Sequence, residues 1–182
     1  MSYTTQITGE EAVTLDEARN HLRITDFNED GMILSLITAA REWAETYSEK
    51  AIVEQTVTAY YENLSIVMQL PLGNASALTK IDYLDPTGGA QSLTTGVILT
   101  KSTPNKAVFV DSVPDNKKQV DSVEIKYRAG FANDSVPYRI KQAILLLVAD
   151  MYEHREMQVL GQRFDQNPTI DRLLFPVREL GI

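Results

Sequence analysis

Apolar residues in segment 136–156, VPYRIKQAILLLVADMYEHRE, recur at helical spacing. Four of them form a stripe that we expect to face the core: Ile140, Ile144, Leu147 and Met151. Pro137 favours the first helical turn, where its missing N–H costs nothing. The centre, 143–149, is apolar all round, but it is far shorter than the ~20 residues of a membrane span. Because such a helix needs cover on every side, we expect part of that cover to come from another subunit.

Two helix starts precede this segment. Thr14–Glu17 is a capping-box pattern that opens a short amphipathic helix, with Leu15, Ala18 and Leu22 on one side. Asp26–Glu29 repeats the pattern and opens a helix that continues to about Glu49. Its apolar stripe is wide and predicts packing on more than one neighbour: Met32, Ile33, Leu36, Ile37, Ala40, Trp43, Ala44 and Tyr47.

Between the helices the pattern changes to short runs rich in Val, Thr and Tyr, which are typical of strands. Asp85–Gly89 contains Pro and two Gly residues and predicts a turn. About six strands are predicted: Ile52–Tyr61, Ile66–Leu70, Leu78–Leu84, Val97–Lys101, Ala107–Val110 and Val123–Tyr127.

This order of elements predicts an α+β protein. Residues 1–50 and 129–182 are expected to form a small helical bundle with a C-terminal tail, and 51–128 an inserted β block. The tail contains a short helical segment, Thr169–Leu174, before a break at Pro176.

Composition narrows the functional classes. The 182 residues lack cysteine, which excludes disulfides, thiolate catalysis and Cys-ligated zinc. The formal net charge is −8, whereas a protein that grips DNA phosphates should be basic. Residues 1–11 lack the pattern of a signal peptide, and we expect no membrane partner.

Candidate chemistry is sparse. There is no nucleophile elbow, P-loop or dinucleotide-binding motif. His154 lies at the end of the long helix and His21 near the end of the first helix, where both are explained as structural residues. We therefore expect no enzymatic activity, no cofactor and no metal. A hydrolase using His154 and a nearby carboxylate remains an alternative.

Several segments, in order, resemble the head–tail connector (adaptor) proteins of long-tailed bacteriophages, a DNA-packaging-associated family also found in prophages. Val13–Arg23 resembles that family's start, as does the acidic stretch Asp26–Asp30 before the helix carrying Ile37–Tyr47. The hallmark is Val136–Pro137 followed by two helical stretches, Ile140–Val148 and Tyr152–Glu156. The closing segment Leu173–Arg178 is similar too, although the family more often has Tyr where Val177 stands.

The resemblance implies a structural virion protein at the head–tail junction, assembled in the host cytoplasm. Its subunits would form a ring of about twelve copies docked on the portal protein, through heterologous contacts. Packaged double-stranded DNA would pass through the channel without sequence-specific binding, and a stopper or tail-completion protein would assemble on the other side. The fold implied is a helical bundle with a β region between its helices.

We expect the helices 29–49 and 137–156 to form the ring wall, and the tail to contact the portal or a neighbour. The subunit and portal interface residues predicted in this way are Leu145, Leu146, Leu173, Leu174, Phe175 and Arg178. Packing of the tail on its own bundle is the alternative for that segment. A β-domain binding module of a phage or prophage, recognising a host surface or ligand, is the alternative function.

Overall fold

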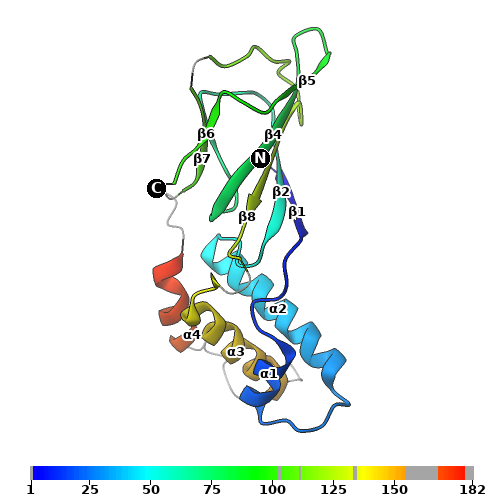
Figure 1. Ribbon diagram of the computed structural model, residues 1–182, viewed down its shortest axis with the longest axis vertical. Coiled ribbons are helices and arrows are strands. Elements are labelled where there is room, and N and C mark those ends of the chain that lie inside the picture. Colours follow the sequence, from blue (N-terminus) through cyan, green and yellow to red (C-terminus); the bar gives the residue numbers. More distant parts are fainter. Residues whose placement is uncertain (1, 102–103, 111, 133–134, 155–167, 179–182) are drawn as a thin grey trace, which may run out of the picture. The chain divides into compact units, whose positions relative to one another are not determined.

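The structure is a computed structural model that describes residues 2–101, 104–110, 112–132, 135–154 and 168–178. Over these residues the chain forms two compact units (Figure 1). The β unit comprises residues 2–9 and 49–132, and the helical unit is drawn from residues 10–48 and 133–178. The helices lie in one unit and the antiparallel sheets in the other, which confirms the predicted α+β class.

The helical unit is built from four described helices and a final 3₁₀ turn. In chain order they are α1 (Leu15–Leu22), α2 (Asp30–Ser48), α3 (Tyr138–Glu153), α4 (Pro168–Leu174) and η2 (Phe175–Val177). Helix α3 packs against α2, α4 packs against α3, and α1 contacts both α2 and α3. Their buried faces share one core, formed by Val13, Ala18, Ile33, Ile37, Ala40, Ala44, Ile140, Ala143, Ile144, Leu147, Val148, Ile170 and Leu174.

Local capping chemistry explains where these helices begin. The predicted capping box at α1 is present: the Glu17 N–H donates to Thr14 Oγ1 at 3.2 Å, and the Thr14 N–H donates to Glu17 Oε2 at 2.8 Å. This backbone hydrogen bond is the main reason that the pKa of Glu17 lies below its usual value. Asp26 instead accepts from the Asn28 N–H at 3.0 Å and holds a turn, so α2 begins at Asp30, later than the pattern indicates.

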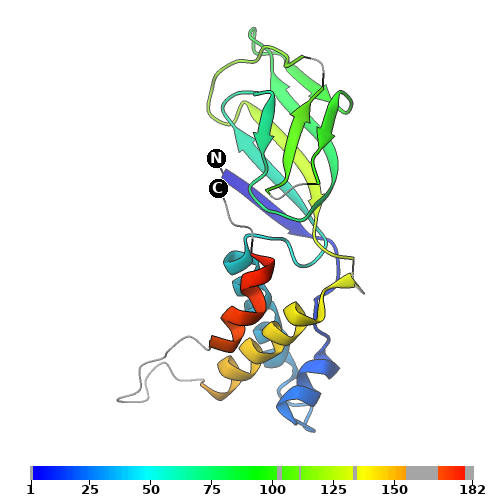
Figure 2. The same ribbon diagram turned by 90° about the vertical axis from the view of Figure 1, so that its left-hand side faces the viewer.

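The β unit contains two antiparallel sheets. The larger sheet has the order β1-β2-β8-β4-β5, and the smaller sheet has the order β3-β7-β6 (Figures 1 and 2). The strands are β1 (Ser2–Ile7), β2 (Gln55–Tyr61), β3 (Val67–Gln69), β4 (Ala75–Leu84), β5 (Ala90–Leu93), β6 (Val97–Leu99), β7 (Lys106–Phe109) and β8 (Val123–Ala129).

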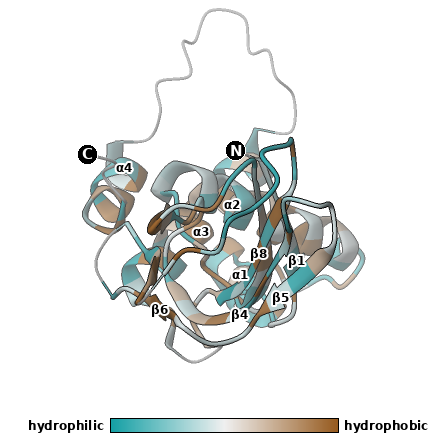
Figure 3. Ribbon diagram, turned by 90° about the horizontal axis from the view of Figure 1, so that it is seen from above, coloured by the Kyte–Doolittle hydropathy of each residue, from teal (hydrophilic) through white to brown (hydrophobic). Residues whose placement is uncertain are grey.

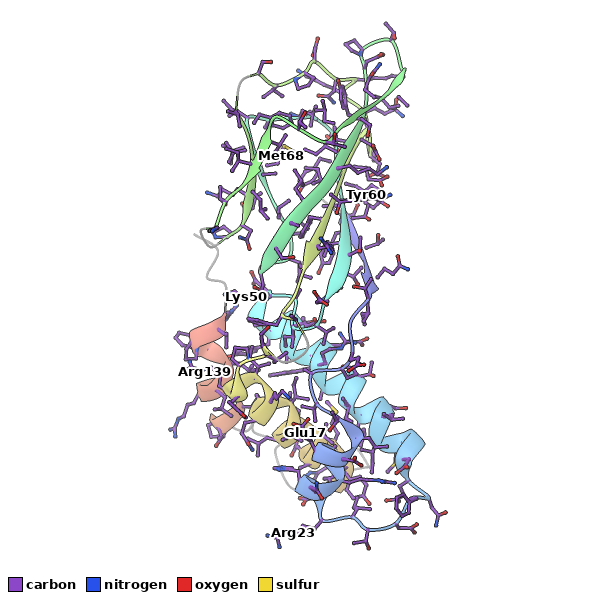
Figure 4. The ribbon with its side chains drawn as sticks, in the orientation of Figure 1. Glu17, Arg23, Lys50, Tyr60, Met68 and Arg139 are labelled. Carbon is purple, nitrogen blue, oxygen red and sulfur yellow. The ribbon has the colours of Figure 1, made fainter. Side chains whose placement is uncertain are left out.

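Alternate side chains of both sheets meet in a separate core. Val57, Ile81, Ile125 and Tyr127 enter it from the larger sheet, and Met68, Ala107 and Phe109 enter it from the smaller one; Met68 is labelled in Figure 4. The buried Tyr127 hydroxyl lies 3.2 Å from both the backbone N and the backbone O of Leu72, so it fixes the segment before β4.

Six of the eight described strands match predicted runs, whereas β1 and β5 were not predicted. β1 pairs antiparallel with β2 along its whole length, from Ser2 opposite Tyr60 to Ile7 opposite Gln55. Residues 2–9 and 129–132 therefore lie in the β unit. The larger sheet recruits β1 because Tyr, Thr and Ile favour extended backbone, even where few apolar positions mark a strand.

Candidate assembly surfaces

The described residues offer no cluster of side chains for metal binding. No group of three or more His, Cys, Asp or Glu side chains in this part of the chain could hold a metal ion. His154 Nδ1 lies 3.1 Å from the Asp150 carbonyl oxygen and 3.4 Å from Asp150 Oδ1, so its partner is the preceding turn of its own helix. Among the described helices, none is sufficiently long and apolar to cross a membrane.

Helix α3 carries the first predicted interface residues. Leu145 and Leu146 are both half-buried in the described residues, whereas Ile140, Ile144 and Leu147 are buried. The helix is fixed at both ends, because Lys141 Nζ lies 3.4 Å from Glu17 Oε1 and the Tyr152 hydroxyl donates to Glu29. Glu17 and Arg139 are labelled in Figure 4. The partial exposure of Leu145 and Leu146 leaves their interface role a proposal.

The tail carries the other predicted interface residues, and the structure divides them. Leu174 is fully buried and packs within the helical unit, whereas Leu173 is half-buried and Phe175 is 57% exposed. The guanidinium of Arg178 lies over the Tyr47 ring, 5.6 Å from its centroid. Leu174 at the end of α4 thus packs on its own bundle, and Phe175 at the start of η2 is exposed to solvent.

Arg41 of α2 is the centre of a buried charge network that the sequence pattern did not indicate. Its side chain is 2% exposed and lies among three carboxylates. Arg41 Nε donates to Glu11 Oε2 at 2.9 Å, and Nη1 donates to Glu45 Oε2 at 2.6 Å. Glu11 also accepts from the Thr38 hydroxyl at 3.0 Å. Since Glu11 precedes α1 in the chain, this network fixes the entry segment of the helical unit against α2.

The β unit has a shallow hollow of about 620 Å³ beside the ends of β2 and β3. Tyr60, Tyr61, Glu62, Met68, Gln69 and Asp121 are among its lining residues. The Tyr61 hydroxyl donates to the Gln69 carbonyl at 2.5 Å, and burial raises the pKa of Tyr61. This hydroxyl therefore stays protonated and serves as a packing group.

Comparisons with known proteins relate this chain to a family of phage proteins. Residues 12–71 match the family model of the phage gp6-like head-tail connector proteins. The resemblance to the head–tail connector family is thus confirmed over α1, α2, β2 and β3. No curated protein matches the chain.

Solved structures extend the likeness to the whole fold. A chain in the neck of an empty gene transfer agent (GTA) particle, computed with C6 symmetry, has a TM-score of 0.81 and 22% identity, with 100% of this chain and 97% of that chain covered. A chain of the native GTA virion gives the same values. A chain of the native neck, computed with C12 symmetry, has a TM-score of 0.76 and 21% identity over the same shares. At these identities the likeness establishes the fold.

Proposed function

We propose that this chain is a ring-forming head–tail connector: a structural protein of a phage-like virion, located at the head–tail junction. The observation that carries the proposal is the match of residues 12–71 to the head-tail connector model. The full-length likeness to chains from GTA necks of C6 and C12 symmetry supports a cyclic assembly. The lack of a metal-binding cluster in the described residues fits a structural role.

The finer parts of the proposal concern partners. The ring docks on the portal protein, carries the stopper or tail-completion protein on its other side, and lets packaged DNA pass through its channel. The net charge of −8 supports passage of DNA, because an acidic surface repels phosphates and gains nothing from counterion release. Host cytoplasm is the proposed site of assembly. Leu145, Leu146, Leu173, Phe175 and Arg178 remain proposed contacts of the ring wall and portal.

Light-scattering mass and negative-stain microscopy of the purified chain test this function, together with binding to the portal protein of the same genome. Rings of about twelve subunits are the expected result. A chain that stays monomeric and also fails to bind the portal would overturn the proposal. Deletion of residues 173–182 tests the tail separately, and the tail contact is wrong if portal docking and ring formation both survive.

A binding-module function is the second candidate, because the β unit has a core of its own. A fragment of residues 51–128 would lack β1, which pairs with β2 along its whole length. The test therefore uses the full chain, in a glycan and host-surface binding screen. Specific binding to a glycan or receptor, with no ring and no portal binding, would favour this second candidate.

A further inference from the structure

The smaller sheet of the β unit carries apolar side chains on both faces, and on its outer face these lie beside one polar pair, Gln69 and Lys106. Its inner face contributes Met68, Ala107 and Phe109 to the core. Because side chains alternate along a strand, the residues between them point outward. The register places Val67 and Ile98 on either side of Val108, so three β-branched aliphatic side chains form a row across the outer face. We call this row, Val67–Val108–Ile98, the outer row.

The outer row is open to solvent. Val67 is 45% exposed and Ile98 is 57% exposed, and Val108 between them is half-buried. Ile66, beside β3, and Val110, directly after β7, add further exposed aliphatic surface. β6 is coloured as hydrophobic in Figure 3. A solvated sheet face normally carries polar side chains, so a contiguous apolar row on an outer face marks a surface that a partner covers.

The surface is also nearly free of charge. The ten residues of β3, β6 and β7 include one charged side chain, Lys106, and no acidic one. The unit around them is close to neutral as well, since residues 1–9 and 49–132 contain nine acidic and eight basic residues. The acidic charge is concentrated in the helical unit, where residues 10–48 and 133–178 contain fifteen acidic and nine basic residues.

This distribution of charge indicates which partner covers the outer row. Two copies of a chain with net charge −8 repel each other, most strongly through their helical units. Copies can therefore approach at a neutral, apolar surface, and the outer row provides one. We infer that the outer row of each subunit packs against the β unit of the next copy in the ring, as one half of a heterologous contact. The inference rests on the proposed ring and adds the β unit to its wall.

The test introduces charge at the two most exposed positions of the row. Val67→Asp with Ile98→Asp should weaken self-association at least about tenfold, because each carboxylate would be desolvated in the contact. Val67→Thr with Ile98→Thr keeps the β-branched shape and should weaken it several-fold. Thr94→Asp with Thr95→Asp adds the same charge at exposed loop positions of the same unit and should leave self-association unchanged. Circular dichroism and thermal unfolding verify that each variant is folded.

Light-scattering mass over a range of protein concentrations measures the outcome, and portal binding is measured in parallel. If the Val67/Ile98 variants assemble to the same extent as the wild type, the inference is overturned and the proposed function still stands. A monomeric wild type that binds the portal would also overturn it, and loss of that binding in the Asp variant would identify the portal as the occupant. A wild type that neither assembles nor binds the portal would overturn both.

Discussion

Gly130 follows β8 at a position that no other residue can occupy without strain. Its φ is +106°, and a Cβ would lie 2.0 Å from the Val53 carbonyl oxygen, which is backbone and cannot rotate away. Gly130→Ala should therefore destabilise the protein by about 3 kcal/mol or prevent folding. Gly96→Ala is the matched control, because Gly96 also has a positive φ, +78°, but its Cβ would meet open space. That control should cost about 1 kcal/mol in urea unfolding. Equal losses for the two variants would contradict the steric argument.

Asp85 makes the turn between β4 and β5 sensitive to acid. Its carboxylate accepts hydrogen bonds from the Thr87 hydroxyl at 2.6 Å, the Gly89 N–H at 2.9 Å and the Gln91 side chain at 3.2 Å. These bonds, with the Thr87 hydroxyl first, lower the pKa of Asp85 to about 2. Because the folded pKa lies below the unfolded value of ~3.9, the stabilisation is complete above that value and is lost as the pH falls through about 2.

The variant Asp85→Asn isolates this contribution. It should unfold at lower urea concentration than the wild type at neutral pH, and the difference should shrink as the pH falls from about 5 to about 2. Asp115→Asn, on an exposed loop, controls for the loss of one negative charge. A difference between Asp85→Asn and wild type that stays constant over this pH range would show that the carboxylate charge does not stabilise the turn.

Leu174 at the end of α4 and Phe175 at the start of η2 are adjacent residues that were both predicted to lie at an interface, yet one is buried and the other exposed. Leu174 is fully buried, so Leu174→Ala should lower the free energy of unfolding of the helical unit by about 2–5 kcal/mol. Phe175 is 57% exposed, so Phe175→Ala should change that free energy by less than about 0.5 kcal/mol. Urea unfolding followed by Trp43 fluorescence measures both, since this tryptophan lies in α2 and stacks on Tyr47. Portal binding reduced by Phe175→Ala at unchanged stability would support its proposed contact.

Elements were predictable where their signals are local. The capping box at Thr14 and the apolar stripes located three helices to within a few residues, because caps and 3.6-residue periodicity are properties of a short stretch of chain. β1 escaped detection because its two large apolar residues, Tyr3 and Ile7, are separated by Thr and Gln. The sequence of β5, AQSL, lacks an alternation of apolar and polar residues that would distinguish a strand from a helix or a loop.

The candidate surfaces were less predictable, because they depend on pairing between distant strands. Val67, Ile98 and Val108 belong to three separate strands, and their row exists only once the register of β3, β7 and β6 is known. The burial of Arg41 likewise depends on Glu11, which reaches it from another segment. Half-buried Leu145 and Leu146, by contrast, follow from the apolar run within α3 itself.

At the scale of the whole molecule, charge and apolar surface are segregated between the two units. The helical unit carries most of the net charge, whereas the β unit is nearly neutral and exposes the outer row. A subunit of this kind can associate through one unit while its other unit stays repulsive. The repulsion between acidic copies depends on ionic strength, whereas the burial of aliphatic side chains does not. A change in salt concentration therefore separates the two contributions to self-association.

Self-association should therefore strengthen when NaCl rises from ~0.01 M to ~0.15 M, because the screening length shortens from ~30 Å to ~8 Å and repulsion between acidic copies weakens. Asp16→Asn with Glu153→Gln supplies the matched variant. Both positions are exposed in the helical unit, and the double substitution reduces the net charge from −8 to −6. This variant should associate more strongly than the wild type at low salt and respond less to added salt. Light-scattering mass against NaCl concentration measures both effects. Dissociation on adding salt would mean that ion pairs hold the subunits together, and the apolar contact at the outer row would then be secondary.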